Sequence, residues 1–171
     1  MKKFLMIALV VAMMTALIAA PVMAAGKNGQ SGKSNIGHLY LWEKDNTDWT
    51  ILEGGAWGKM KYNLSGETFD FVFNGHELEP GLDYTLIYYP DPWPGNNLIC
   101  LGTGTVCEDG NIHIKNSVKT GDLPIESDEN DGAKIWLVLT DDVDCDNNVM
   151  IGWNGTEYLF EGALITFEDI N

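Results

Sequence analysis

Arginine is absent from all 171 residues, and lysine supplies every one of the 10 basic side chains. The acidic side chains number 25, so the formal net charge is −15 at pH 7. Nucleic acids and anionic membrane surfaces are bound mainly by cationic side chains. The composition therefore argues against both as partners. It leaves two interpretations of the acidic residues, which are solubility and the binding of multivalent cations.

Long apolar runs are lacking too, except at the N-terminus. A basic head over residues 1–3 is followed by an apolar run over 4–20, then by a proline and several small residues. This layout is typical of a secretory signal peptide over residues 1–25, with the mature chain beginning at Ala25 or Gly26. An uncleaved membrane anchor is the alternative. In both cases we expect a secreted or cell-surface protein, and no membrane span in the mature chain.

Helical periodicity is missing after the leader. Residues 26–35 contain no apolar side chain and predict a flexible lead. From there on, short alternating runs bounded by Gly, Pro, Asn and Asp indicate strands. Two of them, 84–89 and 134–139, are apolar on both faces and indicate central strands. We expect strands over the runs 36–42, 57–64, 69–73, 84–89, 134–139 and 158–167. Residues 36–171 are thus predicted to form one all-β domain, an antiparallel Greek-key sandwich of immunoglobulin or fibronectin type III type.

One hairpin is predicted from its turn residues. Asp109-Gly110 lies between two strand-like runs, and both residues tolerate the positive φ that a two-residue type I′ turn needs. In that hairpin Cys107 would face Ile112, and Val106 would face His113.

A second local motif predicts a connection between sheets. Residues 78–84 match the pattern L-x-P-G-x-x-Y, with Leu78, Pro80, Gly81 and Tyr84 at its fixed positions. This is the tyrosine corner of Greek-key sandwiches. Pro80 presets φ for the turn, and Gly81 permits a positive φ. We expect the Tyr84 hydroxyl to hydrogen-bond to the backbone of the corner.

Three cysteines leave one unpaired in a secreted domain. Cys100 and Cys107 lie on one extended run, and seven residues separate their Cα atoms by about 23 Å. A disulfide needs Cα atoms about 4.4–6.8 Å apart, so this pair is excluded unless the run bends back at Gly102 or Gly104. The spacing leaves two pairings open, Cys100–Cys145 and Cys107–Cys145, and three buried free thiols are the alternative to any disulfide.

Several longer blocks of the chain carry a family resemblance. They are GGAWGKMKY, FDFVFNGHELEPGLDYTLIYYPDPWPGNNLICLG, GAKIWLVL, DVDC and YLFE, and they cover most of residues 36–168. Together they resemble a family of small secreted prokaryotic proteins of unknown function. The resemblance implies a shared extracellular domain, and it brings neither an activity nor catalytic residues. It also implies the pairing Cys100–Cys145, because the cysteines of LICLG and DVDC recur in that family, and it leaves Cys107 as a free thiol or an intermolecular link.

No catalytic motif is recognisable. The three histidines, His38, His76 and His113, show no ligand spacing such as H-x-H, and neither a nucleophile elbow nor a phosphate loop is present. We therefore expect scattered surface histidines and no enzyme activity. A secreted hydrolase or metal-dependent enzyme that uses surface carboxylates or histidines is the alternative.

An acidic stretch suggests a cofactor. Asp142, Asp144 and Asp146 stand at alternate positions of one loop, and calcium takes six to eight such hard oxygens. The stretch resembles the first half of an EF-hand loop, but Asn147 stands where that loop needs glycine. Ca²⁺ binding and a solvated acidic loop are the two interpretations of this stretch.

The octapeptide YYPDPWPG over residues 88–95 is the remaining unusual feature. Its prolines force extended backbone and remove hydrogen-bond donors, so it predicts a rigid corner. Trp93 would then cover the sandwich as a lid. Alternatively Tyr88, Tyr89 and Trp93 form a rigid surface that stacks on a sugar ring. The sequence as a whole indicates an extracellular binding or surface-interaction module, whose ligand is an unknown carbohydrate or protein.

Overall fold

The computed structural model describes residues 34–92 and 96–171. The predicted signal peptide over 1–25 and most of the predicted lead lie outside the described residues, as does Trp93. The described part is all-β, as predicted. It contains no helix long and apolar enough to cross a membrane.

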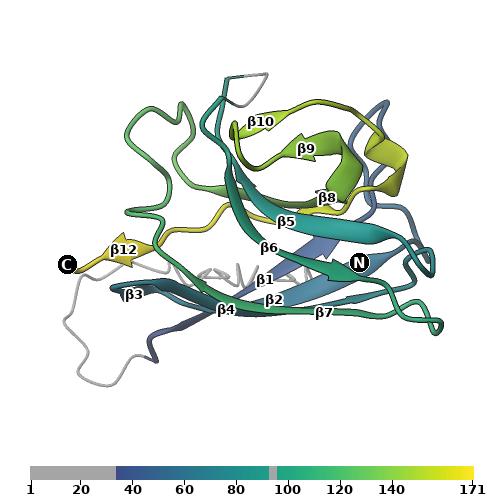
Figure 1. Cartoon of the computed structure of the whole chain (residues 1–171), viewed down its shortest axis with the longest axis horizontal. Coiled ribbons are helices and arrows are strands. Elements are labelled where there is room, and N and C mark those ends of the chain that lie inside the picture. The colour runs from purple at the N-terminus through teal and green to yellow at the C-terminus, as the bar shows by residue number, and fades with distance from the viewer. Residues whose placement is uncertain (1–33, 93–95) are drawn as a thin grey trace, which may run out of the picture. The chain divides into compact units, whose positions relative to one another are not determined.

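Two antiparallel sheets pack face to face (Figure 1). The larger sheet has five strands in the order β11-β1-β2-β4-β7, and the smaller has three in the order β6-β5-β8. The principal strands are β1 (Ile36–Trp42), β2 (Trp57–Asn63), β4 (Phe69–His76), β5 (Asp83–Tyr89), β6 (Ile99–Thr105), β7 (Ile112–Val118) and β8 (Lys134–Leu139). The short ones are β3 (Ser65–Gly66), β9 (Val143–Asp144), β10 (Val149–Met150), β11 (Phe160–Glu161) and β12 (Glu168–Asp169). Two 3₁₀ turns are η1 (Thr140–Asp142) and η2 (Gly155–Glu157).

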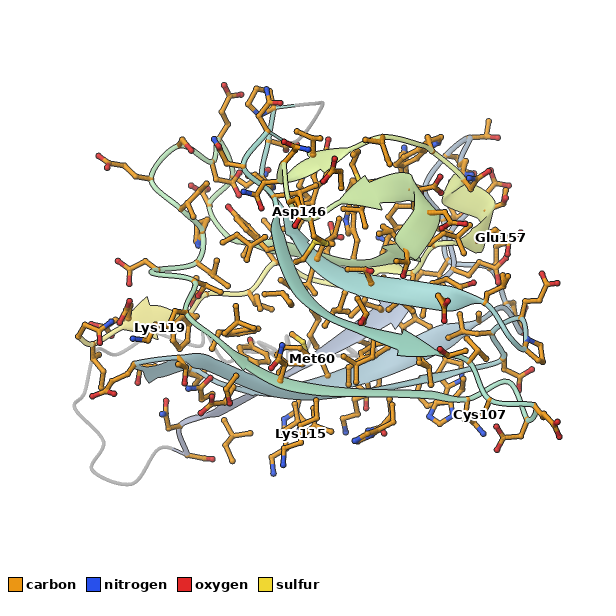
Figure 2. All side chains as sticks on the ribbon, viewed as in Figure 1. Met60, Cys107, Lys115, Lys119, Asp146 and Glu157 are labelled. Atoms are coloured by element: carbon orange, nitrogen blue, oxygen red, sulfur yellow. A yellow bond between two sulfur atoms is a disulfide. The ribbon has the colours of Figure 1, made fainter. Side chains whose placement is uncertain are left out.

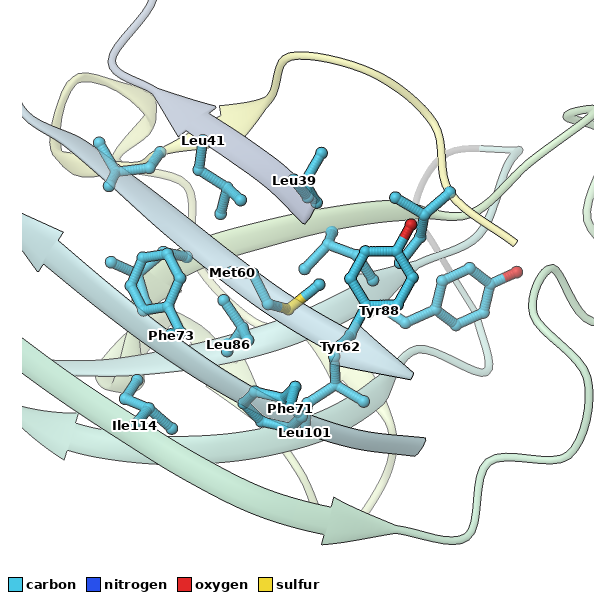
Figure 3. Packing of buried hydrophobic residues seen from close by; sticks show 14 of the residues in the cluster. Leu39, Leu41, Met60, Tyr62, Phe71, Phe73, Leu86, Tyr88, Leu101 and Ile114 are labelled. Atoms are coloured by element: carbon cyan, nitrogen blue, oxygen red, sulfur yellow. The ribbon is translucent and has the colours of Figure 1, made fainter. Parts of the chain in front are cut away.

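Side chains that alternate along the strands point inward and fill the space between the two sheets. Every second residue of β4 points inward and is buried, and residues of β5 and β6 in the smaller sheet meet them from the other side (Figure 3). Phe73 lies across Gly58 of β2, where a Cβ atom would come within 2.2 Å of its ring. Each fully buried Phe or Leu contributes about 1.5–3 kcal/mol of transfer free energy. The sandwich thus follows from the period-2 pattern of its strands.

The strands β5 and β8 are buried on both faces, which confirms the prediction that they are central. On the face away from the main core, Tyr89 and Trp136 pack against Tyr158 and Phe160. The segment 143–160 therefore covers the smaller sheet, and Figure 1 shows β9 and β10 on that side.

The disulfide Cys100–Cys145 ties this cover to β6. The Cα atoms of the two cysteines lie 5.8 Å apart, and 45 residues separate them in sequence. The pairing implied by the resemblance is thereby confirmed. Cys107 is free and exposed.

The predicted type I′ hairpin is wrong in its register. The Cys107 amide donates to the Asn111 carbonyl over 2.8 Å, and the Gly110 amide donates to the Cys107 carbonyl over 3.0 Å. Three residues thus form the turn, and only Gly110 has a positive φ, of 77°. The physical reason is that β6 and β7 belong to different sheets, so this connection must cross between layers.

The strand predicted over 158–167 is mostly irregular. Only β11 is regular, and Leu159, Ile165 and Phe167 form isolated bridges. Leu159 pairs with β8 of the smaller sheet, while β11 pairs with β1 of the larger one. A segment that joins both sheets cannot keep a single ladder, and it closes one edge of the sandwich.

Candidate functional site

The outward face of the larger sheet carries side chains that the main core does not use. In β1 and β2 the inward residues, such as Leu41 and Met60, are fully buried, and the alternate residues point to solvent. Figure 2 shows Lys115 of β7 pointing away from the smaller sheet. The outward side chains of this sheet are therefore candidates for contact with a ligand.

Aromatic rings run in a row across three strands of this face. Trp42 of β1 stands directly opposite Trp57 of β2, and Trp57 stands opposite His76 of β4. The ring centroids of Trp42 and Trp57 lie 6.2 Å apart, and those of Trp57 and His76 lie 4.5 Å apart. Tyr40 stacks on Trp42 at 5.8 Å and is 42% exposed. We call Tyr40, Trp42, Trp57 and His76 the aromatic row.

The aromatic row leads into a hollow of about 620 Å³. We call it the end hollow; its polar lining comes from His76, Glu77, Glu108, Asp109 and Asn111. Asn111 fixes the imidazole of His76, since the Oδ1 and Nδ1 atoms lie 2.6 Å apart. Carboxylates and amides of this kind hydrogen-bond to hydroxyl groups. The end hollow thus supplies the polar partners that the flat rings lack.

The same face gathers basic side chains. His38, Lys61 and Lys115 share one register level across β1, β2 and β7, and Lys59 and His113 share the next. We call these five residues the basic patch. The Lys59 Nζ atom lies 5.3 Å from the centre of the Tyr40 ring, so it joins the patch to the aromatic row.

The histidines predicted to be scattered therefore occupy one sheet face. The alternation within each strand was readable from the sequence, but the order of strands in the sheet was not. His76 and His113 each contact an asparagine oxygen, Asn111 and Asn74 respectively. Neither contact is the carboxylate–histidine pair that general base catalysis commonly uses.

The predicted stacking surface of Tyr88 and Tyr89 is wrong, because both rings belong to the core. Tyr88 is 0% exposed and Tyr89 is 1% exposed. Tyr89 stacks on Trp136 with centroids 4.0 Å apart, under the cover formed by residues 143–160. Neither ring can stack on an external ligand, and Trp93 lies outside the described residues.

Around these rings the predicted rigid corner is held by side chains. The Tyr88 hydroxyl donates to Asp128 over 2.5 Å and accepts from the Ile125 amide over 3.2 Å. Burial, together with the carboxylate of Asp128, raises the pKa of Tyr88. Lys134 and Asn130 donate to Asp91. Burial alone would raise the pKa of Asp91, but these donors hold it below its ordinary value.

The tyrosine corner forms without the expected hydrogen bond. Leu78 is buried, and Gly81 has a φ of 84°. Among the described residues, no hydrogen bond joins the Tyr84 hydroxyl to the corner backbone. Tyr84 instead lines a separate pocket of about 280 Å³ whose wall includes Glu43, Glu77, Glu79 and Glu157. Burial, followed by the charges of three of these glutamates, raises the pKa of Tyr84 to about 12.

The three aspartates predicted to bind calcium do not converge. Asp142 is buried and accepts hydrogen bonds from the Tyr158 hydroxyl over 2.6 Å and from the Asn154 side-chain Nδ2 over 2.7 Å. Asp144 accepts from the backbone amides of Asp146 and Asn147 at 3.0 Å each. In the part of the chain that the structure describes, no group of three His, Cys, Asp or Glu side chains is arranged to hold a metal. Calcium binding stays a prediction, without a preformed site in the described residues.

Comparisons with protein-family models, with curated proteins and with solved structures give no match for this chain. The resemblance to small secreted prokaryotic proteins therefore rests on the sequence blocks that carry it, and the function must be argued from the site.

Proposed function

We propose that the domain is a non-catalytic, extracellular carbohydrate-binding module, and that the aromatic row is its binding surface. A sugar ring has an apolar face of C–H groups and a rim of hydroxyls. It therefore needs a flat aromatic surface beneath it and hydrogen-bonding groups beside it. The aromatic row provides the first and the end hollow provides the second. The single observation that carries the proposal is the contiguous row of the Trp42, Trp57 and His76 rings on the solvent side of the sheet.

The shape of the surface favours a chain of sugars over a single sugar. Neighbouring strands lie about 4.8 Å apart, so a row that crosses from β1 to β4 extends over about 10 Å. The rings of Trp42 and Trp57 are held by cross-strand stacking. Rings ordered before binding reduce the loss of conformational entropy when the ligand binds. The predicted signal peptide supports the extracellular setting of such a ligand.

The proposal is tested by removing one ring of the aromatic row. The mature protein and its Trp57→Ala variant are titrated with a panel of soluble polysaccharides, and binding is followed by calorimetry. We expect at least about a tenfold loss of affinity, since a central interface tryptophan contributes more than about 1.4 kcal/mol.

Trp49→Ala is the matched control. Trp49 is 49% exposed but lies outside the aromatic row, in the loop before β2. It should bind like the unmodified protein. Equal affinities in the unmodified protein and the Trp57→Ala variant, or the same loss in both variants, would remove the aromatic row as the binding surface.

A further inference from the structure

The sheet face that carries the aromatic row differs in charge from the rest of the molecule. The whole chain has a formal net charge of −15 and contains only 3 histidines. All three histidines and three lysines nevertheless point outward from β1, β2, β4 and β7. Among the outward residues of these strands, Asp70 is the single carboxylate, and it accepts a hydrogen bond from Thr68 over 2.8 Å. The face is thus locally basic on an acidic protein.

The charges on this face are separated along the strands. Trp57 and Lys61 lie on the same side of β2, and four residues of an extended strand span about 13 Å. The end hollow, with Glu77, Glu108 and Asp109, adjoins Trp57 and His76. Lys61 and Lys115 lie at the opposite end of the same face. A ligand that covers the face therefore meets rings and carboxylates at one end and ammonium groups at the other.

We infer that the ligand is an acidic polysaccharide, whose sugar rings stack on the aromatic row while its carboxylate or sulfate groups pair with Lys59, Lys61 and Lys115. This inference rests on the proposed carbohydrate-binding function and names its ligand class. Lysine is a compact, rotatable point charge, so it recognises an anion without demanding the fork geometry of a bidentate contact. The absence of arginine is therefore no obstacle. Hydroxyl groups of the same chain fill the end hollow, where an anion would be repelled.

Single-stranded nucleic acid is another polyanion that could use this face, since its bases stack on aromatic side chains and its phosphates pair with cations. It carries a phosphate at every nucleotide, so a strand along the aromatic row would bring phosphates against the carboxylates of Glu77, Glu108 and Asp109. A polysaccharide can present uncharged hydroxyls at that end. Charge complementarity over the whole face thus favours the polysaccharide.

The test compares matched charged and uncharged chains on the full mature protein. The probes are an oligosaccharide of alternating uronate and uncharged sugars with its methyl ester, and a partly sulfated β-glucan with its unsulfated form. We expect at least one acidic probe to bind about tenfold or more tightly than its uncharged partner at low salt. Added sodium chloride should reduce that preference, because exposed charges are screened.

The double variant Lys61→Gln/Lys115→Gln should lower the affinity for the acidic probe to that of its uncharged partner. Lys119→Gln is the matched control, since Lys119 is exposed and lies beyond the end of β7, apart from Lys115 in Figure 2. It should leave the preference unchanged.

Three results would overturn the inference: no preference for either acidic probe, an unchanged preference in the double variant, or tighter binding of a single-stranded oligonucleotide. The first two leave the carbohydrate-binding function standing if uncharged chains still bind and Trp57→Ala still weakens them. Loss of the Trp57→Ala effect on every chain would instead remove the proposed function itself. The two failures are thus distinguishable.

Discussion

Trp42 of β1 and Trp57 of β2 stand directly opposite each other, and their rings stack with centroids 6.2 Å apart on the solvent side of the larger sheet. Two large rings placed this way support each other across neighbouring strands, and both remain partly exposed on the outer face of the sheet. Such pairs stabilise a sheet by about 0.2–1 kcal/mol, which is far less than the same rings would contribute in a core. The arrangement therefore suits binding better than folding.

The disulfide should be important for stability. Replacing both Cys100 and Cys145 by serine removes a link that closes a loop of 45 residues and anchors the cover of the smaller sheet. We expect the free energy of unfolding to fall by about 2–4 kcal/mol, measured by denaturant titration. Cys107→Ser is the control and should leave the midpoint unchanged, since Cys107 is exposed and unpaired. A fully stable double variant would contradict the anchoring role.

The hydroxyl groups of Tyr158 and Tyr84 should contribute differently to the free energy of unfolding. The Tyr158 hydroxyl donates to buried Asp142 over 2.6 Å, whereas Tyr84 lines a pocket and its hydroxyl makes no hydrogen bond to the described corner backbone. Tyr158→Phe should destabilise the fold by about 1–3 kcal/mol, because it leaves a buried carboxylate short of a donor. Tyr84→Phe should cost less than about 0.5 kcal/mol on the same scale. The reverse order in equilibrium unfolding would show that the tyrosine corner is closed in solution.

Glu161 should make stability depend on pH. Burial raises its pKa, although the Trp136 indole donates to its carboxylate over 2.5 Å. A raised pKa in the folded state gives a contribution that is full below the unfolded value, about 4.3, and is lost as the pH rises through the folded value. Glu161→Gln keeps an acceptor for Trp136 and removes the charge. The variant should therefore gain stability over the unmodified protein as the pH rises above the unfolded value of about 4.3. A difference in unfolding free energy between the two proteins that does not change with pH would contradict a raised pKa of Glu161.

Calcium should not stabilise the fold through Asp142. That side chain is already bound to Tyr158 and Asn154, and Asp144 bonds within its own loop. We expect equal shifts of the melting temperature in calcium and magnesium, reflecting the screening of a negatively charged chain. Asp142→Asn should lower the melting temperature to the same extent in EDTA and in calcium. Stabilisation by calcium alone, abolished in Asp144→Asn, would instead support the predicted calcium site.

How far the sequence predicts this molecule depends on the range of the interactions involved. The bounds of β1 follow from local alternation and those of β8 from a short apolar run, and both match the predicted 36–42 and 134–139. The burial of Tyr89 cannot be predicted from local sequence, because it depends on the distant segment 143–160 closing over β5. An octapeptide rich in aromatics and prolines looks exposed when only its neighbours in sequence are considered.

The candidate site was missed for a similar reason. Trp42, Trp57 and His76 are far apart in sequence, and only the pairing of β1 with β2 and of β2 with β4 brings them together. The alternation in each strand predicts which residues point the same way. Register and strand order, however, depend on how the strands pair in the sheet. The turn at Gly110 shows the same limit, because its positive φ was predictable and the crossing between sheets was not.

The central claim is tested most directly by locating a bound oligosaccharide on the protein. In a nitrogen-labelled sample, the indole N–H signals are assigned with single Trp→Phe variants, and the ligand found in the titrations is then added. The account predicts that the signals of Trp42 and Trp57 shift with ligand concentration, while those of Trp49 and buried Trp136 stay in place. Shifts at Trp49 or Trp136, with Trp42 and Trp57 unmoved, would contradict the claim that the outward face of the five-stranded sheet is the binding surface.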